Sequence, residues 1–66
     1  MTINTTRIEL TLAEKGWTRA ELAARCGISR QNVSTILRRG TAEPKTVGKI
    51  ASGLGVDPAE ILKEEA

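Results

Sequence analysis

The 66-residue sequence contains no histidine, no phenylalanine and no tyrosine, and it has one cysteine and one tryptophan. A single cysteine cannot form an internal disulfide, and without histidine it cannot build a zinc site or a Cys/His nucleophile pair. These absences count against a disulfide-stapled secreted protein and against a metal-stapled fold. We therefore expect no enzymatic activity, no metal and no cofactor.

Long apolar stretches are missing as well. No run approaches the roughly 20 residues that a membrane span needs. The start, MTINTTRIEL, lacks the basic residues and the hydrophobic core of a signal peptide. We therefore expect a cytoplasmic protein without a membrane partner. Because so short a chain buries only a small core, we also expect a single domain over residues 1–66 and no enclosed active-site cavity.

Charge is distributed unevenly along the chain. Residues 15–49 contain eight basic and two acidic residues, a net charge of +6, whereas the two ends together contain two basic and six acidic residues, a net charge of −4. A basic centre between acidic ends indicates a surface for a polyanion. Taken alone, the same charges are explained as well by an ordinary solvated surface.

Helix signals recur, and no stretch alternates apolar and polar residues in the manner of a strand. Apolar spacing, capping residues and glycines predict five short helices, at about 5–15, 18–27, 29–40, 44 or 46 to 55, and from 57 onward. Thr18 with Glu21 forms the pattern of a capping box, Ser29 is the N-cap of the third helix, and Asp57-Pro58 opens the fifth. We expect a compact all-α fold of five helices.

Two neighbouring segments carry the pattern of a known family. The first, WTRAELAARCGISRQNVSTILRRG, spans residues 17–40, and the second, KTVGKIASGLGV, spans residues 45–56. Together they closely resemble the helix-turn-helix domain of the lambda-type phage repressor and Cro family, also called the XRE-like regulators. The resemblance implies a lambda-repressor-like fold with the helix-turn-helix at helices two and three. It also implies a bacterial or phage-encoded transcriptional regulator that binds double-stranded DNA, by family habit as a repressor.

In similar proteins the polar face of the third helix, here about residues 29–38, enters the major groove. The resemblance assigns base reading to Arg30, Gln31 and Thr35, with Ser34 as a weaker candidate. Arginine can donate two hydrogen bonds to guanine, glutamine can pair with adenine, and the threonine methyl can pack on thymine. Since an arginine in the first turn opposes the helix dipole, Arg30 is better explained by binding than by helix stability.

Phosphate contacts in similar proteins come from helix N-termini and from basic residues beyond the recognition helix, because N-termini present free N–H groups and partial positive charge. The corresponding residues here are Thr18, Arg19, Asn32, Arg38, Arg39, Lys45 and Thr46. The family commonly has glutamine where this chain has Arg19. We expect the added charge to raise affinity while fixing the register less tightly.

The segment after the fourth helix packs against a second copy in similar proteins. The resemblance thus predicts a dimer contact at Val56, Pro58, Ala59 and Ile61, and two copies would read an inverted-repeat operator. The same residues could equally close the core of so short a chain. The alternative function is the antitoxin of a toxin-antitoxin pair, which binds both DNA and a protein partner. An exposed apolar patch beyond the dimer surface would favour that alternative.

Trp17 and Cys26 have simple structural interpretations. Trp17 directly precedes an N-cap and is predicted to pack against Leu22 as a hydrophobic staple, rather than to stack on a nucleobase. Cys26 occupies an apolar position before a turn glycine, and we expect it to behave as a small buried hydrophobic residue.

Overall fold

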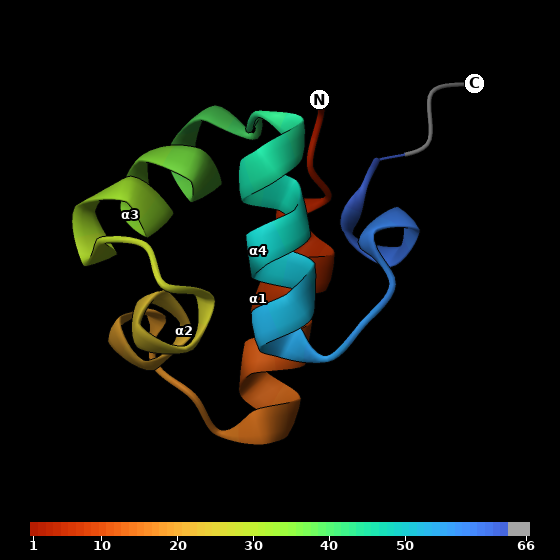
Figure 1. Cartoon of the computed structure of the whole chain (residues 1–66). Helices are drawn as coiled ribbons and strands as arrows, with labels where there is room; N and C mark the ends of the chain where they lie inside the picture. The colour runs from red at the N-terminus through yellow and green to blue at the C-terminus, as the bar shows by residue number, and fades with distance from the viewer. Residues whose placement is uncertain (64–66) are drawn as a thin grey trace.

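The computed structural model describes residues 1–63, and its elements are four α-helices and one short 3₁₀ helix (Figure 1). These elements are α1 (Thr5–Lys15), α2 (Arg19–Cys26), α3 (Arg30–Arg39), α4 (Pro44–Leu54) and η1 (Pro58–Ile61). The all-α class and the first four helices are confirmed. The prediction of a fifth α-helix is wrong, because η1 is a single 3₁₀ turn.

The chain leaves helical geometry at the end of η1 because it pairs with the N-terminal segment. Within η1 the Glu60 N–H donates to the Asp57 carbonyl at 2.9 Å, which is the i to i+3 pattern of a 3₁₀ helix. Leu62 then adopts extended backbone angles and forms an antiparallel bridge with Ile3. Asp57 does cap η1, and the cap is reciprocal, because the Asp57 N–H donates to the Glu60 carboxylate at 2.9 Å.

The α-helices begin and end at their sequence signals. The Thr18 hydroxyl accepts the Glu21 N–H at 3.2 Å, and the Ser29 hydroxyl accepts the Asn32 N–H at 3.0 Å. At α2 the structure shows this one side of the predicted capping box. A glycine with φ between 69° and 74° follows each α-helix, a left-handed conformation that other residues seldom adopt.

The N-terminal segment lies between two later parts of the chain, which the sequence did not predict. Thr2 forms an antiparallel bridge with Thr41, next to the bridge between Ile3 and Leu62. The Ile3 N–H donates to the Gly40 carbonyl at 2.8 Å, and the Ile3 side chain is only 3% exposed. This segment thereby ties the end of α3 to the end of η1.

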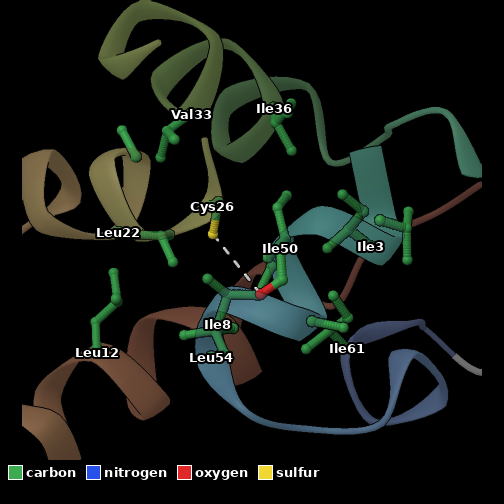
Figure 2. Packing of buried hydrophobic residues seen from close by; sticks show 13 residues of the cluster. Ile3, Ile8, Leu12, Leu22, Cys26, Val33, Ile36, Ile50, Leu54 and Ile61 are labelled. Carbon is green, nitrogen blue, oxygen red and sulfur yellow. Dashed lines mark hydrogen bonds between the residues drawn. The ribbon is translucent and has the colours of Figure 1, made fainter. Parts of the chain in front are cut away.

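One cluster of buried apolar side chains lies among the helices (Figure 2). Every element contributes to it, and its members are Ile3, Ile8, Leu12, Leu22, Ala23, Cys26, Val33, Ile36, Val47, Ile50, Ala51, Leu54 and Ile61. The central helix is α4, which packs against α2 and η1, while α2 also packs against α3 (Figure 1). Because Val33 and Ile36 attach α3 to this core, the opposite face of α3 points outward.

Cys26 lies at the contact between α2 and α4. Its thiol donates to the Ile50 carbonyl at 3.7 Å (Figure 2), and burial raises the pKa of this thiol. A Cβ added at Gly53 would lie 2.4 Å from the Cys26 sulfur. The absence of a side chain at Gly53 is therefore what lets the two helices pack so closely.

No helix formed by residues 1–63 combines the length and the apolar character that a membrane crossing requires. The same residues bring together no group of three or more His, Cys, Asp or Glu side chains that could hold a metal ion.

Candidate nucleic-acid interface

The outward face of α3 is polar along its whole length. Arg30, Gln31 and Ser34 are exposed, and Thr35 is half-buried. The Thr35 hydroxyl donates to the Gln31 carbonyl at 3.0 Å, one turn earlier in the same helix. Residues three or four apart lie on one side of a helix. Gln31, Ser34 and Thr35 therefore form one surface, on a helix that lies at the edge of the molecule (Figure 1).

An open groove runs between the start of α2 and this face of α3, and we call it the α2–α3 groove. Its lining consists of Arg19 from α2 and of Gln31, Ser34, Thr35, Leu37 and Arg38 from α3. Three of the predicted base-reading residues thus lie together, with a predicted phosphate contact from each helix beside them. Arg30 is exposed at the start of α3 and does not line this groove.

A second groove lies on the other side of α3, toward the start of α4. Its lining includes Asn32, Thr35, Arg39, Glu43 and Thr46. The structure thus brings three more predicted phosphate contacts together beside Thr35, which lines both grooves. Lys45 is exposed in the first turn of α4. Glu43 is the N-cap residue of α4, and its side chain makes no capping hydrogen bond. Because Glu43 also lines this groove, the groove contains one acidic group.

Arg19 is paired with an acidic residue of α1. Its Nη2 donates to Oε1 of Glu9 at 2.7 Å, and the two side chains are 49% and 53% exposed. Sequence reasoning assigned Arg19 to phosphate and did not find Glu9. The two residues are ten positions apart in different helices, a spacing that carries no helical signal.

A comparison with protein families identifies the kind of domain that carries these surfaces. A family model described as Helix-turn-helix matches residues 8–61, which is most of the chain. The chain belongs to this helix-turn-helix family, the XRE/lambda-repressor-like regulators. It is therefore a DNA-binding regulatory domain, and α2 and α3 are its helix-turn-helix. Searches of curated proteins and of solved structures each found no match.

One basic residue of α1 and one of α2 contact the tryptophan. The Nζ of Lys15 lies 5.0 Å from the centroid of the Trp17 ring, and the Cζ of Arg25 lies 4.1 Å from it. Both distances fit cation–π interactions. Trp17 itself is half-buried and packs against the core cluster. Part of the central positive charge thus serves packing at the junction of α1 and α2.

The residues predicted to form the dimer contact, in the segment after α4, differ in their exposure. Pro58 and Ala59 are exposed and Val56 is half-buried. Ile61 is 1% exposed and belongs to the core. Of the four predicted contacts, Pro58, Ala59 and part of Val56 are therefore accessible at this surface, whereas the Ile61 side chain is held inside the domain.

Proposed function

We propose that the protein is a sequence-specific regulator of transcription that binds a double-stranded DNA operator, with α3 in the major groove. One observation carries the proposal. Gln31, Ser34 and Thr35 share a groove with Arg19 and Arg38, on a helix whose other face is fixed in the core. Hydrogen-bonding groups on a rigid helix, flanked by cations, match the base edges and phosphates of a major groove.

We assign base reading to Gln31, Thr35, Ser34 and Arg30, in the roles that their chemistry allows. Gln31 pairs with adenine through its amide, and Arg30 donates two bonds to guanine. The Thr35 hydroxyl is bonded to the Gln31 carbonyl. That bond orients the Thr35 side chain, whose methyl group contacts thymine in this proposal.

Phosphates on the two sides of the major groove are assigned to residues around α3. The start of α2 contributes Thr18 and Arg19, and the second groove contributes Asn32, Arg39 and Thr46. Arg38 and Lys45 add positive charge at the end of α3 and the start of α4. Phosphate contacts of this kind hold the protein in register and carry no sequence information themselves.

We further propose that the protein binds as a homodimer to an inverted repeat and represses transcription by occupying it. The exposed Pro58 and Ala59, with Val56, are the apolar groups that support a contact there. Two copies would read half-sites separated by about one helical turn, roughly 34 Å. Such a regulator would act in the cytoplasm of a bacterium or of a phage host.

The antitoxin alternative receives no specific support from the exposed surface of residues 1–63. The large apolar side chains exposed there are Met1 and Leu10, each 54% exposed. They belong to different segments, and scattered apolar side chains of this kind are normal on a soluble surface. We therefore retain the transcriptional regulator as the proposed function.

Selection from a pool of random duplexes tests the proposal directly. At near-physiological salt we expect enrichment of an inverted repeat whose half-sites are about one helical turn apart. Enrichment of a single unrepeated site would support sequence-specific binding and contradict the dimer. Binding without any enrichment would contradict sequence-specific regulation, because nonspecific binding is a property of basic charge alone.

Replacing Lys45 with alanine is expected to weaken binding to all duplexes by a similar factor. The lost phosphate contact should also make the plot of log affinity against log salt shallower by about 0.9. Titrations of operator and unrelated duplexes at several salt concentrations measure both effects. The Lys63→Ala variant removes an equal charge far from α3 in sequence and is the control. An unchanged slope in Lys45→Ala would remove Lys45 from the phosphate contacts.

A further inference from the structure

An acidic residue lies where the proposed function calls for positive charge alone. Arg19 lines the α2–α3 groove with the predicted base-reading residues, yet its Nη2 donates to Glu9 Oε1 at 2.7 Å. This is the one ion pair that the structure shows within residues 1–63. A donor that DNA phosphate would use is therefore already bonded to a carboxylate of α1.

Carboxylate and phosphate make equivalent demands on a guanidinium. Each presents a pair of anionic oxygens that accept hydrogen bonds from the fork of N–H donors. The two anions also repel each other. A DNA phosphate that approaches Arg19 must therefore displace Glu9 or lie beside its negative charge. Either event reduces the binding free energy that the phosphate contact contributes.

We propose that Glu9 competes with DNA phosphate for Arg19 and so limits the affinity of the domain for DNA. This inference rests on the proposed function, because it requires DNA to bind along the α2–α3 groove. The pair is half exposed, so it opens readily, and its strength decreases with salt. In this proposal Glu9 offsets part of the positive charge that Arg19 adds to the helix-turn-helix, so the gain in affinity expected from Arg19 is smaller.

The test replaces Glu9 with glutamine, which keeps the size of the side chain and removes its charge. We expect the Glu9→Gln variant to bind the selected operator and an unrelated duplex more tightly, in each case by about two- to fivefold. Because Arg19 then gains a full phosphate contact, the salt dependence should become steeper by about 0.9 in log–log slope. Fluorescence anisotropy titrations at several salt concentrations measure both quantities.

Two further variants separate competition from a general effect of charge. Glu14→Gln removes an equal charge from an exposed position of the same helix, and we expect a smaller gain in affinity and no added phosphate contact. Arg19→Gln removes the residue over which Glu9 and DNA compete. In that background we expect the Glu9→Gln substitution to have no more effect than Glu14→Gln.

Each outcome bears on the inference separately from the proposed function. Equal effects of Glu9→Gln and Glu14→Gln would overturn the competition, as would a gain that persists in the Arg19→Gln background. Weaker binding by Glu9→Gln would overturn it too, because Glu9 would then position Arg19 for DNA. All three results would leave sequence-specific binding intact. Only a wild-type protein that binds no duplex would remove the proposed function and this inference together.

Discussion

Replacing Gly53 with alanine is expected to destabilise the fold by about 2 kcal/mol, within the usual cost of overpacking a core. The new Cβ would lie 2.4 Å from the Cys26 sulfur and 3.2 Å from backbone atoms of Arg25 and Cys26. Since backbone atoms and a buried thiol surround the added Cβ, the clash can be relieved only if α2 and α4 move apart. For a domain of this size the melting temperature should fall by roughly 10 °C.

Gly48 offers a matched control in the same helix. A Cβ added at Gly48 meets no atom within 4 Å. Alanine is preferred over glycine inside a helix by roughly 1 kcal/mol. We therefore expect Gly48→Ala to raise the free energy of unfolding, while Gly53→Ala lowers it. Urea denaturation followed by circular dichroism gives both values, and two changes of the same sign would contradict the role assigned to Gly53.

A double variant locates the clash. Cys26→Ala removes the sulfur that lies closest to the added Cβ, so Gly53→Ala should cost less in that background than in the wild type. Because the contacts of the added Cβ with backbone atoms at 3.2 Å remain, only part of the lost stability should be recovered. Strictly additive effects of the two substitutions would show that the strain lies elsewhere.

The helices were predictable because their signals are local. An N-cap hydroxyl three residues before the N–H that it binds, and a glycine directly after the last turn, specify where a helix begins and ends. Thr18, Ser29, Gly27 and Gly40 all act in this way in the structure. Asp57 was interpreted correctly as a cap, but no local signal indicates that the helix it caps ends after four residues.

The features that sequence reasoning missed all join distant residues. Ile3 is buried because it pairs with Leu62, and this depends on how the folded chain brings its two ends together. The contact between Cys26 and Gly53 depends on the distance between α2 and α4. No sequence pattern around Cys26 or Gly53 predicts that the two residues are in contact. Gly53 was therefore visible only as an unfavourable residue inside a helix.

The candidate site was predictable on α3 and less so around it. Helical periodicity separates Val33 and Ile36 from the outward residues, which the structure confirms. Periodicity also places Ile61 among apolar residues without deciding whether it faces the core or a partner. In the structure Ile61 is in the core, since η1 packs against α4.

Replacing Gln31 with alanine is expected to relax the sequence preference of the protein. Gln31 is exposed and lies among the residues of the α2–α3 groove. In the proposed complex it makes a two-bond contact with a base, and such a contact discriminates by about 1–3 kcal/mol. The operator should therefore lose roughly five- to 150-fold in affinity, while an unrelated duplex binds nearly as before.

A comparison of single-base operator variants shows whether Gln31 reads one position. The Gln31→Ala protein should become indifferent to the base pair at a single place in each half-site and keep its preferences elsewhere. Gln31→Glu is the informative second variant, because a carboxylate only accepts hydrogen bonds and would favour the amino group of cytosine. Equal losses on every duplex would instead show that Gln31 contacts the backbone. Base reading would then fall to Arg30, Ser34 and Thr35, the other residues of α3 to which we assign it.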